Sequence, residues 1–422
     1  MNKIKSLLLL ISVSLIAGTL QAGSFEKDVK SAQGTVKGET APEPTLTQAV
    51  THQGGTKWWS VNFFGSAHRA IIKASLKQID GGLYPDMAAA ADDLKEGAND
   101  ESGHPDDTMN GGDVRALWEG AKPETKGGVL QNYQLFKFHQ AYERLGTIIH
   151  LTQDQSVPTH AANIKHGISD SFEGFYDNTV KIPSIRFSED MAPYAYYQAL
   201  QDDTRSKLAG WTDPATNLMY WVPAPDAPPL GQDATFGPRG HYGGKRNRDV
   251  YAVPPPNNTS DGNNDNTWTS AHPEVRLQQL TAAGEATVRV MQSASKRLPP
   301  IIKDLAATSL TVDEKTGALV RFTAFDNRSA SLKFMATVYR GEEKLGVVAT
   351  GEFPLNAKDE TGIMRVGNGS FVWSGSAGGE RLPAGTYILE VRFKDTDGNI
   401  SPEALSAAPD YAGRTKVEFT LN

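Results

Sequence analysis

The sequence predicts an α-helical domain followed by an all-β module. From Trp58 to about Leu298, apolar residues recur at spacings of three and four, which is typical of helices that bury one face. After Pro299-Pro300 the pattern changes to short stretches in which apolar and polar residues alternate, separated by turns rich in Gly and Asp. Because the period changes at one point in the chain, we expect two segments of different structural class.

The first segment, residues 58–300, is predicted to hold the helices. The helical spacing covers Ala67–Ile79, Met87–Glu96, Leu130–Gln155, Ser171–Val180, Pro193–Gly210 and Glu274–Arg297. Pro223–Pro238 and Val253–Asn266 are crowded with Pro, Gly, Asn and Asp, which favour turns over regular structure. We expect long irregular connections at those two places.

The second segment, residues 305–422, is predicted to be a β-sandwich. The expected strands are Leu319–Phe325, Leu332–Tyr339, Lys344–Gly351, Ser370–Ser374, Tyr387–Phe393 and Thr415–Leu421. The stretch from Leu382 to Asn399 resembles the penultimate hairpin of an immunoglobulin-like or fibronectin-type module. Within it, Asp395, Asp397 and Asn399 could bind calcium, although an Asp-Gly hairpin turn is the simpler interpretation.

The N-terminus has the layout of a secretory signal peptide. Residues 1–22 begin with Lys3 and Lys5, continue with the apolar run Leu7–Ile16 and end in small residues. We therefore expect a secreted protein, extracellular or periplasmic, whose mature chain begins near Gly23. Residues 23–57 are polar and without a sustained apolar period, which predicts a leader or a propeptide.

Composition narrows the function classes. The 422 residues include no Cys, which excludes disulfides and thiolate metal sites and leaves His, carboxylate and main-chain groups as metal ligands. Asp and Glu total 49 against 42 Lys and Arg, so an acidic surface disfavours attraction to nucleic acid phosphates. We expect no nucleic acid partner, and a monomer.

The histidines gather in the helical segment. Eight of the nine lie between His68 and His272, and the β-module has none. His150 and Asp154 are four residues apart, about one helical turn, so an imidazole and a carboxylate on one face can reach the same ion. Further ligand types follow closely, namely His160, His166, Asp170 and Glu173. This density of donors predicts a metal site.

The order of these residues resembles a known motif. Leu145-Gly146, the His150/Asp154 pair and Pro158-x-His160-x-x-Asn163 resemble the core motif of the zinc-dependent phospholipase C family, whose superfamily also includes zinc nucleases that cut single strands. The resemblance is tight over about 25 residues, extends loosely over about 240, and leaves out the β-module. It implies a mainly α-helical catalytic domain like those of zinc phospholipases C.

The resemblance also implies a zinc cluster of up to three ions and a set of ligands. Those ligands are Trp58, His68, Asp100, His104, His150, Asp154 and His160, completed by His166, Asp170 or Glu173. Trp58 would serve through its amino group, which requires cleavage after Lys57. Asp100, in the segment that begins Gly97-Ala98, would be the bridging ligand or catalytic base. His104 follows Asp100 more closely than in the family.

The function that the resemblance implies is hydrolysis of a phosphatidylcholine-type phospholipid to diacylglycerol and a phosphorylated head group. The partner would then be a phospholipid membrane surface. Zinc would act as Lewis acid and activate water, so no covalent nucleophile is needed. Two alternatives stay open: a nuclease or other phosphodiesterase of the same superfamily, and a secreted binding protein whose zinc is structural.

Overall fold

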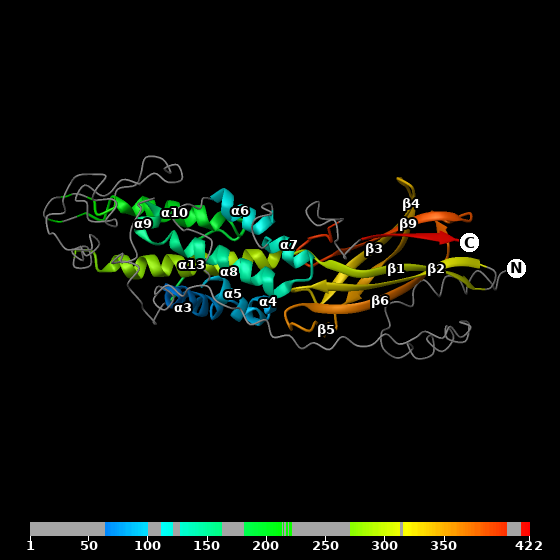
Figure 1. Ribbon diagram of the computed structural model, residues 1–422, viewed down its shortest axis with the longest axis horizontal. Helices are drawn as coiled ribbons and strands as arrows, with labels where there is room; N and C mark the ends of the chain where they lie inside the picture. Colours follow the sequence, from blue (N-terminus) through cyan, green and yellow to red (C-terminus); the bar gives the residue numbers. More distant parts are fainter. Residues whose placement is uncertain are drawn as a thin grey trace, which may run out of the picture. The chain divides into compact units, whose positions relative to one another are not determined.

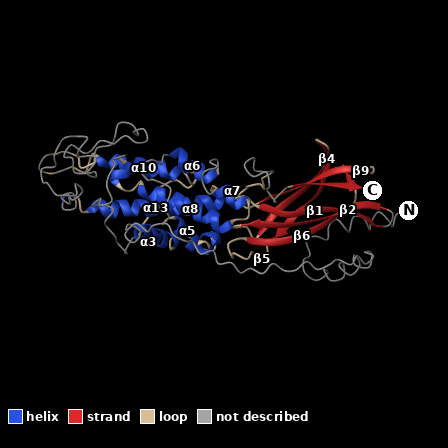
Figure 2. Ribbon diagram, in the orientation of Figure 1, coloured by secondary structure: helices blue, strands red, loops and turns tan. Residues whose placement is uncertain are grey.

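The structure is a computed structural model that describes residues 64–99, 111–120, 127–162, 181–212, 214, 217, 219–221, 271–312, 315–402 and 415–422. All of them belong to one compact unit, Trp59–Asn422. The helices precede the strands along the chain, and all the strand pairings are antiparallel (Figure 2). The coarse prediction of a helical part followed by a β part is confirmed.

The helices of the described residues are labelled in Figure 1 where there is room. They are α3 (Phe64–Leu76), α4 (Pro85–Ala89), α5 (Ala91–Gly97), α6 (Gly111–Glu119), α7 (Val129–Gln134), α8 (Phe138–Asp154), α9 (Pro158–Ala161), α10 (Ala195–Leu208) and α13 (Glu274–Arg297). The long helix Glu274–Arg297 was predicted with these bounds. The predicted helix Ser171–Val180 lies outside the described residues.

Two predicted helices are each divided in two. The stretch Leu130–Gln155 forms α7 and α8, because Phe136 adopts a positive φ of 60°, which no helix accommodates. The stretch Met87–Glu96 forms the end of α4 and most of α5, with a break at Ala90, whose φ of −90° and ψ of 16° lie outside the helical region. In both places the apolar spacing runs across the break, so spacing alone did not indicate it. Helices α6 and α9 were not predicted.

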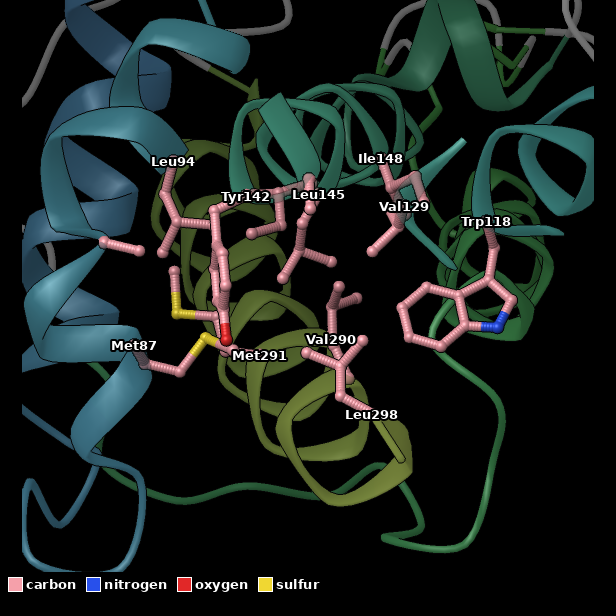
Figure 3. Packing of buried hydrophobic residues seen from close by; sticks show 14 of the residues in the cluster. Met87, Leu94, Trp118, Val129, Tyr142, Leu145, Ile148, Val290, Met291 and Leu298 are labelled. Atoms are coloured by element: carbon pink, nitrogen blue, oxygen red, sulfur yellow. The ribbon is translucent and has the colours of Figure 1, made fainter. Parts of the chain in front are cut away.

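Helix α8 is the centre of the helical part. Fourteen of its seventeen residues are buried, and it contacts α5, α6, α7, α10 and α13. Figure 3 shows part of this core, with Leu94 of α5, Tyr142 and Leu145 of α8 and Met291 of α13 turned toward one another. A helix that is buried along most of its length is a rigid support for side chains near its C-terminal end.

Two glycines allow α5 and α8 to touch through their backbones. A Cβ on Gly146 would lie 2.3 Å from the carbonyl oxygen of Leu94, and a Cβ on Gly97 would lie 1.8 Å from that of Glu143. Neither contact is sterically possible, so glycine is required at both positions. The close approach brings the carbonyl of Ala98, just after α5, onto α8.

The β-module consists of two four-stranded sheets and a small two-stranded one. Its strands are β1 (Ile301–Val312), β2 (Lys315–Asp326), β3 (Ser331–Arg340), β4 (Glu343–Pro354), β5 (Ala357–Lys358), β6 (Arg365–Trp373), β7 (Ser376–Ala377), β8 (Glu380–Arg381), β9 (Gly385–Lys394) and β10 (Lys416–Leu421). The large sheets have the orders β1-β2-β6-β5 and β10-β9-β3-β4. Their facing side chains form one hydrophobic core, which includes Phe322, Phe334, Phe371 and Phe393.

All six predicted strands correspond to observed ones, β2, β3, β4, β6, β9 and β10, although the predicted bounds go one residue past the end of β6 and one before the start of β10. The first strand, β1, and the two-residue strands β5, β7 and β8 were not predicted. The pairing of β1 with β2 shifts register between Lys303 and Ala306, and Asp304 within that bulge has a positive φ of 57°. An extra residue in a strand interrupts the alternation of side chains that identifies strands in a sequence.

The β-module shares buried contacts with the helices. Ile301, Phe325, Ile363 and Met364 belong to the hydrophobic core of the helical part. Among the helices that the structure describes, none has the length and apolar character needed to span a membrane.

Candidate metal centre

Three of the predicted ligands come together in the structure. His68 lies on α3, and His150 and Asp154 lie one turn apart at the end of α8. Each offers one ligand atom, and these atoms all lie within 4.8 Å of one another. The group could hold a metal ion, because two imidazole nitrogens and a carboxylate oxygen are donors typical of protein metal sites.

His150 is oriented by a backbone carbonyl. Its Nδ1 lies 2.9 Å from the carbonyl oxygen of Ala98. Since a carbonyl oxygen only accepts hydrogen bonds, Nδ1 carries the proton and the neutral ring has its lone pair on Nε2. That Nε2 faces Oδ2 of Asp154 at 3.3 Å. A ring N–H that donates to a carbonyl is the usual support of a metal-binding histidine.

His68 has the same arrangement with a different partner. Its Nδ1 lies 2.6 Å from Oε1 of Gln153, and its Nε2 lies 3.4 Å from Oδ1 of Asp154. The two imidazole rings lie side by side, with centroids 4.3 Å apart and an angle of 37° between their planes. Asp154 therefore presents one oxygen to each histidine.

The group lies in a protected place. The side chains of His68, His150 and Asp154 are 13, 3 and 7% exposed. When both rings are neutral with the proton on Nδ1, two nitrogen lone pairs and a carboxylate converge where little water screens them. Atoms of this kind repel one another unless a cation or a proton lies among them. The donor set and its burial thus fit a bound metal ion.

The other predicted site residues divide into two groups. His160 is partly buried on α9 and is not part of the three-residue group that the described residues form. The remaining candidates lie outside the described residues, and they are Trp58, Asp100, His104, His166, Asp170 and Glu173.

Sequence reasoning missed the groups that hold the two imidazoles. Gln153 precedes Asp154 directly, but a buried Gln on a helix has no signal that separates it from core packing. The carbonyl of Ala98 is a backbone group, and its role depends on how α5 crosses α8. The Gly97-Ala98 and Leu145-Gly146 pairs were the available signal, because their glycines permit that crossing.

Two other histidines have partners away from this group. His139, also on α8, is hydrogen-bonded at the surface to Asp93, with Nδ1 3.0 Å from Oδ2. His272 Nε2 lies 2.8 Å from the carbonyl oxygen of Thr212.

In the loop Asp395–Asn399, suggested above as a calcium site, both carboxylates interact with other side chains or backbone groups. Asp395 accepts hydrogen bonds from the backbone N–H and the side-chain amide of Asn399, and Asp397 pairs with Arg328. In the structure these side chains stabilise the turn and join it to the neighbouring β2–β3 connection.

No protein-family model matches the chain, and no curated protein matches it either.

Proposed function

We propose that this chain is a zinc-dependent phosphodiester hydrolase of the phospholipase C type, acting on phosphatidylcholine-type phospholipids. The observation that carries the proposal is the convergence of His68, His150 and Asp154. The motif around His150 concerns about 25 consecutive residues, whereas His68 lies far earlier in the chain. These residues meet, and Nδ1 of each histidine is already hydrogen-bonded, which leaves Nε2 to face the metal position. This arrangement supports the ligand set that the resemblance implies.

The architecture supports the resemblance for both parts of the chain. The helical part places its ligands on a central buried helix, as expected for a zinc phospholipase C-like domain. In the β-module, β1, β2 and β6 share one sheet and β3, β4, β9 and β10 the other, a distribution like that of immunoglobulin-like and fibronectin-type sandwiches. Tyr387, near the start of β9, donates from its hydroxyl to the carbonyl of Pro383 at 2.7 Å, which resembles the tyrosine corner of such modules.

The three residues that meet in the structure would bind metal in the proposed enzyme. His68 and His150 would each contribute Nε2, while Asp154 would contribute one oxygen toward each histidine, an arrangement suited to more than one ion. His160 and the predicted ligands outside the described residues would complete a cluster of up to three. Zinc, when bound, supplies Lewis acidity toward phosphate oxygens and lowers the pKa of water toward neutrality.

Asp100 is the proposed catalytic base. It follows Ala98 by two residues in the sequence, and the carbonyl of Ala98 orients His150. Its role would be to orient the attacking water and accept its proton. The substrate would lie in a membrane surface that the exported protein meets, extracellular or periplasmic, in agreement with the signal peptide proposed for residues 1–22.

The test is hydrolysis of phosphatidylcholine vesicles by the purified secreted protein, with phosphocholine release as the readout. Release should stop when zinc is chelated and return when zinc is restored. His150→Ala and Asp154→Asn should lower the rate by at least about 100-fold, since a missing ligand disrupts the metal that activates water. Cleavage of single-stranded DNA or RNA is measured in parallel.

The matched control is His139→Ala, which removes an exposed histidine from the same helix. It should leave both zinc content and rate unchanged. Zinc-dependent cleavage of nucleic acid without phosphocholine release would support the nuclease alternative and contradict the proposal. A protein that binds zinc tightly but hydrolyses neither substrate would support a binding protein with structural zinc.

A further inference from the structure

Gln153 connects the candidate metal centre to a third helix. Its Oε1 lies 2.6 Å from Nδ1 of His68, and its Nε2 donates to Oγ1 of Thr287 on α13 at 2.9 Å. The hydroxyl of Thr287 in turn donates to the carbonyl of Ala283 at 2.7 Å. Gln153 and Thr287 are almost completely buried, so water does not compete for these bonds.

The direction of every hydrogen bond in this chain is fixed. The carbonyl of Ala283 only accepts, so Thr287 must use its one proton there and accept from the Nε2 amide of Gln153. The oxygen of Gln153 then has to face His68. Because that oxygen also only accepts, Nδ1 of His68 carries a proton, and in the neutral ring the lone pair lies on Nε2, which faces Asp154.

The two histidines are held by different means. His150 donates to the backbone carbonyl of Ala98, a group that depends on the packing of α5 against α8 and that replacing the side chain of Ala98 does not remove. His68 depends on a side chain, and that side chain depends on Thr287. The orientation of His68 is therefore the part of the site that can be changed by replacing a hydrogen-bonding side chain without moving a helix.

We propose that Gln153, fixed by Thr287, is a positioning residue that sets the tautomer of His68 and thereby the affinity of the centre for metal. The metal part of this inference rests on the proposed zinc site, whereas the tautomer part concerns the metal-free protein. Partners of this kind behind a metal ligand typically change metal affinity by about 10- to 100-fold when they are removed.

The first measurement is the tautomer of His68 in the metal-free full-length protein, by ¹⁵N NMR of histidine-labelled protein assigned with His68→Ala. The native protein should show the proton on Nδ1. Gln153→Leu, which has similar size and no acceptor, should shift His68 toward the other tautomer. An unchanged Nδ1–H signal in Gln153→Leu would overturn the proposal.

The second measurement is the zinc dissociation constant by competition with a chromophoric chelator. Gln153→Leu should raise it by about 10- to 100-fold. Gln153→Glu keeps an acceptor oxygen and should restore affinity to within a few-fold of native. Thr287→Val removes the hydroxyl at nearly constant shape and should have an intermediate effect, because Gln153 loses its second anchor.

The matched control is Gln155→Leu. Gln155 is also buried beyond the end of α8, and its Oε1 accepts from Gln201 at 2.9 Å rather than from a histidine. It should lower stability about as much as Gln153→Leu but leave zinc affinity unchanged. Equal losses of affinity in both variants would show a general structural effect and contradict the inference. If the native protein binds no zinc, the proposed function fails, and the tautomer measurement still decides the role of Gln153.

Discussion

Asp326, the last residue of β2, is completely buried. Its Oδ1 accepts hydrogen bonds from the backbone N–H groups of Arg328 and Ser329, while its Oδ2 has no hydrogen-bond partner within the described part of the chain. Burial raises its pKa to about 7 against these hydrogen bonds, and the nearby Asp395 adds to the rise. Burial also raises the pKa of Asp395. The fold therefore holds a proton on this carboxyl near neutral pH.

This carboxyl should make stability fall as pH rises. The folded state binds the proton more tightly than the unfolded chain, whose Asp has a pKa near 3.8. The stabilisation is complete below pH 4 and is lost as pH rises through 7, for a total of up to about 4 kcal/mol. Asp326→Asn should remove this component. The measurement is urea unfolding of the native protein and of Asp326→Asn, with chelator present, from pH 5 to 8. If the free energy of unfolding depends on pH in the same way for both proteins, the prediction is wrong.

At the scale of the elements, the contact between α5 and α8 decides whether the site forms. It places Ala98 against His150, and it requires glycine at positions 97 and 146 because a Cβ would collide with a backbone carbonyl at either. Thr147 lies in the same contact, with its hydroxyl 3.4 Å from the carbonyl oxygen of Gly97. Backbone atoms cannot move aside as a flexible side chain does, so the crossing tolerates no larger residue.

Gly146→Ala tests this contact, because helix propensity and the backbone clash predict changes of opposite sign in the free energy of unfolding. On helix propensity alone, alanine in the middle of a helix should stabilise by about 1 kcal/mol. We expect instead a loss of about 1–3 kcal/mol in the free energy of unfolding, together with weaker zinc binding, because α5 must move away from α8. The control is Gly81→Ala, where a Cβ meets nothing within 4 Å. Urea unfolding measures whether Gly146→Ala raises or lowers the free energy of unfolding. A more stable Gly146→Ala variant would contradict the proposed packing.

At the scale of the whole molecule, a buried polar group joins the β-module to the helices. The carboxylate of Asp86 on α4 accepts hydrogen bonds from Tyr142 on α8 at 2.7 Å, from Ser295 on α13 at 2.7 Å and from Asn327, just after β2, at 2.9 Å. Asn327 also donates to the backbone carbonyl of Ser295 at 2.7 Å. Tyr142 lies two turns before His150 on α8, so the hydrogen bonds around Asp86 and the metal centre both depend on the position of this helix.

Helices and β-module should therefore unfold together. Asn327→Ala leaves a buried carboxylate short of one donor and should cost about 1–3 kcal/mol, shifting a single calorimetric transition to lower temperature. The matched control is Asn368→Ala, at an exposed position of β6, which should change the transition temperature little. Two separate transitions, with only one moved by Asn327→Ala, would show that the parts are independent and contradict this prediction.

The sequence by itself determined the elements whose signals are local. The alternation of apolar and polar residues marked six strands, and the spacing of apolar residues marked Glu274–Arg297 with its observed bounds. The helical turn between His150 and Asp154 was readable because both lie on one regular element. Local patterns did not show the breaks at Ala90 and Phe136 or the bulge at Asp304, since there the backbone departs from regular geometry while the apolar pattern continues.

Only the tertiary structure decided what surrounds the ligands. That His68 meets His150 was an expectation from resemblance, and it depends on how α3 packs beside α8. The roles of Gln153, Thr287 and the carbonyl of Ala98 depend on three helices meeting at one point. The physical reason is that a hydrogen bond is defined by distance and direction within a few tenths of an ångström. Only the packing of distant segments fixes such geometry, whereas a residue's type and its spacing along the chain do not.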